Sequence, residues 1–177
     1  MASGTFDFDA FAQTAIDATK VDYEFKAVPD KTESAAQITA LSGRSMEEYR
    51  DSFQGRHCMS VEVTWSLNDP NLKKELNMDK IEVRQGIIVD LTGVAGEPGT
   101  TIDWSTNRSQ GLKDLMLAVG LNNDKGFNFN KLKHQEGWVI TKMRDATDGS
   151  GRKFSEVARV MNLAKGREAH KAKNGSA

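Results

Sequence analysis

The chain has 177 residues, of which 38% are hydrophobic and 28% are charged, and its formal net charge is −1. This length favours a single domain that buries about 70% of the surface of the unfolded chain. A net charge so close to zero excludes a global field that would draw the protein to nucleic acid or membrane. Any anion site must therefore arise from a local cluster of cations.

The single cysteine, Cys58, excludes an intrachain disulfide, which fits a reducing cytosol. No apolar run approaches the roughly 20 residues that a membrane span needs. The first residues also lack the basic start of a signal peptide. We therefore expect a cytoplasmic protein without membrane contact.

Residues 1–34 have a mixed pattern that predicts an N-terminal arm. FDFDAF, which starts at Phe6, alternates aromatic and acidic residues and predicts a short strand or an arm that docks on the body. YEFKAV, which starts at Tyr23, alternates and then meets Pro29, as an edge segment does. The sequence leaves open whether the arm packs on its own domain or on a neighbour.

Three segments that follow the arm predict strands. Residues 35–44 alternate weakly, whereas residues 59–67 alternate clearly and are rich in β-branched side chains. Residues 81–91 form the third strand, in which Gly86 interrupts the alternation and predicts a bulge or bend. Between the first two strands lies the charged stretch SMEEYRDSFQGR, residues 45–56, with apolar residues at helical spacing.

Two helices are predicted in the next part of the chain. PNLKKELNMDK starts with Pro70, which favours the first turn of a helix. In RSQGLKDLMLAVGL, apolar residues recur at i, i+3, i+4 and i+7 from Leu112 to Val119, and Gly120 stands where a C-terminal cap is expected. Residues 93–107, GVAGEPGTTIDWSTN, predict a polar loop between the third strand and this second helix.

The segment TKMRDATDGSGRKFSEV, residues 141–157, predicts a hairpin with a glycine-rich tip. It joins strands over residues 137–145 and 153–162. Residues 163–177 are rich in lysine and arginine, show no core pattern, and predict a flexible basic tail.

The order of these elements predicts a mostly β domain over residues 35–162. Five strands with one well-formed helix between the third and the fourth are typical of an OB-type barrel. In such a barrel the first-to-second and fourth-to-fifth loops flank the binding face, and here these loops are residues 43–56 and 145–153.

Cations and aromatic residues in and near these loops predict a site for single-stranded nucleic acid, because cations follow the phosphates while bases stack on aromatic faces. The predicted phosphate contacts are Arg44, Arg50, Arg56, Arg84, Lys142, Arg144, Arg152 and Lys153. The predicted stacking surfaces are Tyr49, Phe53, Trp138 and Phe154. The competing interpretation is that the aromatic residues belong to the core and the cations form a solvated rim.

Other chemistries have weaker support in the sequence. GVAGEPGTT lacks the lysine of a phosphate-binding loop. His57 and Cys58 are adjacent, so in a strand they point to opposite faces and do not predict a metal site. Glu62, Glu82 and Asp90 lie opposite the core rows of their strands, where solubility explains them, so a metal-dependent nuclease is only a minor alternative. We expect a protein that is not an enzyme and that holds no metal or cofactor.

The segments VEVTWSLNDPNLKKELNMDKIEVRQGIIVDLT, GLKDLMLAVGLN, FNFNKLKHQEGWVITKM and KFSEVARV span roughly residues 59–161. They resemble a group of bacteriophage-encoded proteins described as a domain of unknown function or as single-stranded DNA-binding proteins. The resemblance implies an OB-like fold that binds single-stranded DNA without sequence preference during phage replication or recombination, in the host cytoplasm.

The resemblance also implies phage or host replication and recombination proteins as partners. Two features depart from the family pattern: the insert around EEYRDSF is longer than expected, and an acidic tail is absent. The alternative function is a β-rich phage structural or interaction protein whose sheet edges join its neighbours. A homo-oligomer is compatible with both functions.

Overall fold

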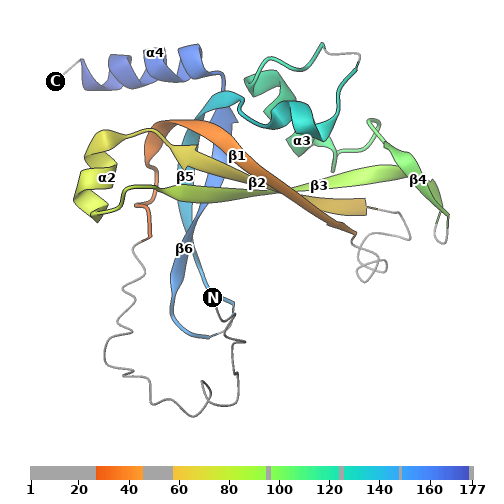
Figure 1. The fold of residues 1–177 in the computed structure, drawn as a ribbon, viewed down its shortest axis with the longest axis horizontal. Coiled ribbons are helices and arrows are strands. Elements are labelled where there is room, and N and C mark those ends of the chain that lie inside the picture. Colours follow the sequence, from red (N-terminus) through yellow and green to blue (C-terminus); the bar gives the residue numbers. More distant parts are fainter. Residues whose placement is uncertain (1–26, 46–57, 95–96, 124–125, 148, 176–177) are drawn as a thin grey trace, which may run out of the picture.

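The computed structural model describes residues 27–45, 58–94, 97–123, 126–147 and 149–175 (Figure 1). The strands are β1 (Glu33–Ser45), β2 (Cys58–Leu67), β3 (Glu82–Val94), β4 (Glu97–Ile102), β5 (Glu136–Asp145) and β6 (Lys153–Met161). The helices are α2 (Pro70–Leu76), α3 (Gln110–Ala118), the 3₁₀ helix η4 (Phe129–Leu132) and α4 (Leu163–Asn174). None of the helices in these ranges has the length and apolar composition required to cross a membrane.

Five of the strands close into a barrel. β1 pairs antiparallel with β2 and β5, β2 pairs with β3, and β5 pairs with β6. The barrel closes through a parallel bridge between Arg84 of β3 and Glu156 of β6. The closed order β1-β2-β3-β6-β5, with α3 between β3 and β5 along the chain, confirms the predicted OB-type barrel.

The inward faces of β2 and β3 supply much of the core. Val63, Trp65 and Leu67 have no exposed surface, as the alternation of β2 predicted. On β3 the row continues through Gln85, which faces inward and accepts a hydrogen bond from Trp65 Nε1 at 3.0 Å. The predicted bulge at Gly86 is wrong, because the β2–β3 register is continuous there. Because Gln85 is polar but belongs to the inward-facing row, the hydrophobic alternation of this regular strand is interrupted in the sequence.

Both predicted helices are present. α2 begins after Asp69, whose Oδ1 accepts from the backbone N–H groups of Asn71 and Leu72 at 2.9 and 3.1 Å. α3 buries its predicted apolar face, including Leu112 and Leu115, against the core. These elements follow from local capping and periodicity, which is why the sequence was sufficient to predict them.

Residues 97–102 were predicted to belong to a polar loop, but they form β4. β3 continues to Val94, and the hydroxyl groups of Thr92 and Thr101 meet across the β3–β4 pair at 2.6 Å. Among the described strands, β4 pairs only with β3. Pro98 therefore lies in an edge strand, where the missing N–H of proline is tolerated.

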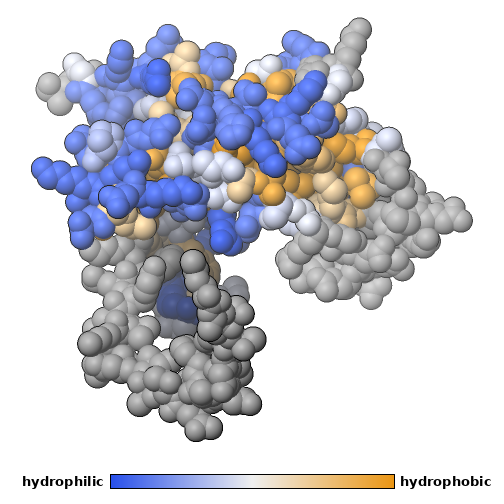
Figure 2. Space-filling model, viewed as in Figure 1, coloured by the Kyte–Doolittle hydropathy of each residue, from blue (hydrophilic) through white to orange (hydrophobic). Residues whose placement is uncertain are grey.

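The predicted flexible tail contains helix α4, which lies across the end of the barrel opposite the β5–β6 hairpin (Figure 1). It begins after Asn162, whose side chain accepts from the N–H of Ala164 at 3.1 Å. Its inner side carries the buried Gly166 and also His170, which contacts Glu33. Figure 2 shows the largely hydrophilic surface over this helix. The sequence missed the contact because one glycine and a histidine, instead of an apolar stripe, face the barrel.

Candidate nucleic-acid interface

A groove of about 640 Å³ lies over the closure of the barrel, on the outer faces of three strands. β2 and β3 contribute Glu62, Arg84 and Gly86, and β6 contributes Phe154 and Glu156. Because β3 and β6 are bridged at Arg84 and Glu156, residues from distant parts of the chain face the same space. The groove also touches the residues that lead into β1, which are Ala27 and Val28.

Gly86 leaves the floor of this groove open. It faces outward between core-facing Gln85 and Ile87, and a β-carbon built on it would meet no atom within 4 Å. A second hollow of about 330 Å³, lined by Ser42, Gly43, Ser60 and Glu62, shares Glu62 with the groove. The two hollows meet at Glu62, one extending toward β6 and the other toward the β1–β2 pair.

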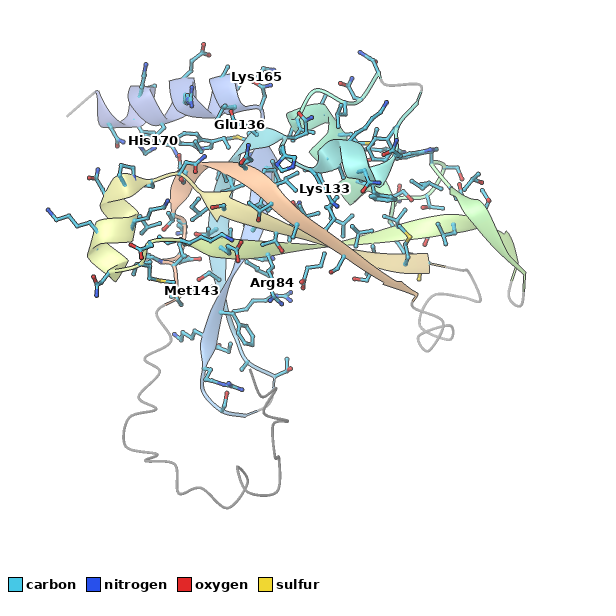
Figure 3. The ribbon with its side chains drawn as sticks, viewed as in Figure 1. Arg84, Lys133, Glu136, Met143, Lys165 and His170 are labelled. Carbon is cyan, nitrogen blue, oxygen red and sulfur yellow. The ribbon has the colours of Figure 1, made fainter. Side chains whose placement is uncertain are left out.

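One predicted cation, Arg84, lines this groove, and Lys142 and Arg144 adjoin it; each is paired with a carboxylate that lines the groove. Arg84 Nη1 lies 3.4 Å from Glu62 Oε1. Lys142 Nζ and Arg144 Nε lie 2.8 and 3.0 Å from the same oxygen, Glu156 Oε1. Figure 3 shows Arg84 projecting from β3 toward the β5–β6 hairpin. Exposed pairs of this kind contribute about 0–1 kcal/mol, so a phosphate group can replace the carboxylate as partner.

Phe154 supplies an aromatic face to the groove. Its side chain is 44% exposed, although its strand is paired on both sides near this point. The next residue is anchored, because Ser155 Oγ donates to the carbonyl of Val28 at 2.8 Å. An exposed ring on an anchored strand is a surface on which a base can stack.

Arg152 and Lys153 are exposed at the tip of the hairpin. Arg152 Nε donates to Ser150 Oγ at 2.9 Å. Gly149 and Gly151 have φ values of 73° and 69°, a region that favours glycine, so the tight tip depends on them. The tip therefore holds these two cations beyond the end of the groove that carries Phe154.

Trp138 is not available as the predicted stacking surface. It does lie on the strand face opposite the core residue Val139, but α4 covers that face and leaves Trp138 only 6% exposed. The His170 ring lies 5.3 Å from the indole, centroid to centroid. The sequence predicted the correct face of the strand but could not reveal the helix above it.

The first predicted loop lies largely outside the described residues. This applies to Tyr49, Arg50, Phe53 and Arg56. Arg44 is described by its backbone, which pairs with Ser60 in the β1–β2 hairpin. The predicted meeting of the two loops around one cleft therefore stays a prediction.

Several groove residues were not among the predicted site residues. Glu62 and Glu156 were missed because the sequence does not show which acids face the cations. Gly86 did carry a signal, as a glycine within an otherwise regular strand. Asp90 differs from its prediction, since it is buried and lies 3.5 Å from Arg108 Nη1, so solubility does not explain it.

The fold defines a small protein of the OB-barrel class, with a groove of charged and apolar side chains on the outer face of its β2–β3–β6 region. Comparison of the chain with family models, with curated proteins and with solved structures gives no match. Within the described ranges, no three histidine, cysteine or acidic side chains gather as metal ligands would.

Proposed function

We propose that this protein binds single-stranded DNA, without sequence preference, in the groove over the β3–β6 closure. The observation that carries the proposal is that Arg84 of β3 and Phe154 of β6 face the same groove. Cationic groups that follow a backbone, combined with an aromatic face for bases, are what sequence-independent binding of single strands requires.

In this proposal, phosphate groups of the DNA replace carboxylates as the partners of the cations. As the DNA strand enters the groove, Arg84 breaks its ion pair with Glu62, and Lys142 and Arg144 break theirs with Glu156. A base stacks on Phe154, which contributes about 1–3 kcal/mol. The cations at the hairpin tip extend the path of the backbone. The resemblance to phage-encoded proteins supports a role in phage DNA replication or recombination.

The first test is a titration of the full-length protein with a fluorescein-labelled thymidine oligonucleotide, followed by anisotropy at several salt concentrations. We expect binding at low salt, and a logarithmic salt slope of about −0.7 for each phosphate contacted. Replacing Arg84 with Ala should reduce that slope by about one contact. Lys74→Ala, on the exposed side of α2, is the matched control. No change in anisotropy at low salt would refute the proposal.

The second test concerns stacking. Phe154→Ala should weaken binding by roughly 5- to 150-fold, which corresponds to the loss of one stacked base. Trp104→Ala is the matched control, because Trp104 is a similarly exposed aromatic residue outside the groove, at 39%. Equal losses in the two variants would show that the groove is not the binding site.

A second candidate function is that of a structural or interaction protein, and one observation favours it. Within the described strands β4 has a single partner, so its outer edge can accept a strand from a neighbour. This function predicts assembly in light scattering without DNA, and assembly that survives Arg84→Ala. A monomer under these conditions would argue against it.

A further inference from the structure

A second groove, of about 650 Å³, lies between α3 and the C-terminal half of β6. Within the described residues, β3 and β6 pair only through Arg84 and Glu156, so the barrel opens beyond Glu156. α3 stands against this opening without filling it. The lining includes apolar side chains from both elements, which are Leu115, Leu117, Ala118, Ala158, Val160 and Met161.

Leu117 makes the surface of this groove unusually apolar. Its side chain is 61% exposed, more than any other large hydrophobic side chain in the described part of the chain. Its neighbours on α3, Met116 and Ala118, are buried, so α3 turns Leu117 away from the core and toward the groove. Leu117 is joined in the groove by the exposed Ala158 and the half-buried Val160 and Met161. Exposed apolar side chains with a polar rim are found at sites of interaction with other molecules.

The rim of this groove carries positive charge that is not neutralised locally. Arg159 and Lys165 line it, and neither has an ion-pair partner among the described residues. Among the described residues, the groove contains one acidic side chain, Asp114, which accepts a hydrogen bond from Gln110 Nε2 at 2.7 Å. Figure 3 shows Lys165 at the end of α4 nearest to α3. These cations differ from Arg84, Lys142 and Arg144, which are all paired.

We propose that this groove binds an acidic segment of a partner polypeptide that carries apolar anchor residues. The anchors pack on Leu117 and Val160, while carboxylates pair with Arg159 and Lys165. DNA fits this surface less well, because none of the described residues that line it is aromatic. A second copy of the chain also fits less well, since a two-fold contact would bring the uncompensated cations of both copies together.

The test uses full-length, isotopically labelled protein and a short synthetic peptide in which acidic residues alternate with leucine and phenylalanine. A peptide with lysine at every acidic position is the charge-reversed control. We expect the acidic peptide to shift the amide resonances of α3 and of residues 157–161 in a saturable manner. Leu117→Asp and the double variant Arg159→Glu, Lys165→Glu should each weaken this binding by roughly tenfold or more.

The double variant Arg167→Glu, Lys171→Glu is the matched control, because it makes the same change of charge as the double groove variant but on the part of α4 outside the groove. It should alter binding less than about twofold. Leu117 and both cations are exposed on this face, so their replacement should leave the thermal midpoint nearly unchanged. The Leu117→Asp variant should also leave the oligonucleotide titration unchanged. This separates the peptide groove from the proposed DNA groove.

Four results would overturn the proposal. They are the absence of saturable shifts with the acidic peptide, equal binding of the charge-reversed peptide, shifts of these amides by an oligonucleotide instead, and a dimer in light scattering that Leu117→Asp dissociates. The third result would assign the surface to DNA, and the fourth would assign it to a second copy of this chain.

Discussion

Gly166 of α4 lies directly against the indole of Trp138 on β5, and a β-carbon built on Gly166 would stand 2.1 Å from Trp138 Cγ. The helix therefore docks through a contact that only glycine allows. Trp138 is buried by this contact, and the basic side chains of the helix remain exposed on its other side. A single glycine therefore allows a charged segment with few apolar residues to pack on the barrel.

Gly166→Ala should release α4 from the barrel. Helix propensity alone would favour alanine by about 1 kcal/mol, but the added methyl group has no space beside the indole. We expect a net loss of about 1–3 kcal/mol in the free energy of unfolding and a red shift of tryptophan emission. The measurements are urea unfolding and fluorescence in a Trp104→Phe background.

Arg167→Ala is the matched control for this experiment, because the neighbouring side chain is exposed. It should change the unfolding free energy by no more than about 0.5 kcal/mol. If Gly166→Ala stabilised the protein, the contact between α4 and Trp138 would not be the close one described above.

Acid should weaken the attachment of α4 to β1. A hydrogen bond from Lys173, together with the nearby His170, holds the pKa of Glu33 below its ordinary value of 4.5, although partial burial opposes this shift. A lowered carboxyl pKa stabilises the fold above the pKa of the unfolded chain, and this stabilisation is lost as the pH falls through the pKa of the folded state. The contribution is at most about 1 kcal/mol, because Lys173 is exposed.

The measurement compares the wild-type protein with Glu33→Gln by urea unfolding from about pH 7 to about pH 3. The difference in unfolding free energy should be largest near neutral pH and should vanish in acid. Glu136→Gln, an exposed change on β5, should show no such trend. A Glu33→Gln difference that is independent of pH would contradict the prediction.

Glu156→Gln should increase the affinity for single-stranded DNA. This carboxylate pairs with both Lys142 and Arg144, so a phosphate group must displace it. Its removal should strengthen oligonucleotide binding by roughly three- to tenfold at low salt. Asp79→Asn makes the same change in net charge outside the groove and should have a much smaller effect. Equal gains in the two variants would point to net charge alone.

Gly86→Val should have opposite effects on stability and on binding. Valine in a strand is favoured over glycine, so the unfolding free energy should stay constant or rise by about 0.5–1 kcal/mol. The new side chain occupies the floor of the groove, so oligonucleotide affinity should fall several-fold. Gly86→Ala should give a smaller loss. Unchanged affinity in the valine variant would mean that the DNA strand binds outside this groove.

Much of the barrel could be predicted because its signals are local. The alternation that ends in Trp65 and Leu67 indicated β2 and its inner face, and the spacing from Leu112 to Val119 indicated α3. The prediction failed where the residue types in a segment are unusual for the structure that the segment adopts. The glycine- and proline-rich residues 97–102 form an edge strand, and Gln85 satisfies the Trp65 indole in a row expected to be apolar.

The candidate site was predictable only in part. Arg84 and Phe154, two of the predicted contact residues, line the same groove, although nothing in their neighbouring sequence shows that they meet. Trp138 satisfied the same residue-type criterion and is buried by α4. The acids Glu62 and Glu156, which hold the cations, carried no recognisable signal.

Periodicity and capping act between residues a few positions apart, so the order of residues was enough to predict the five barrel strands, α2, α3 and the class of barrel. Which outer face stays open is a long-range property, because it depends on segments that meet only when the barrel closes. The bridge between Arg84 and Glu156 brings the groove residues together. The docking of Gly166 on Trp138 covers the other predicted stacking surface. Neither contact can be inferred from the residues that flank it along the chain.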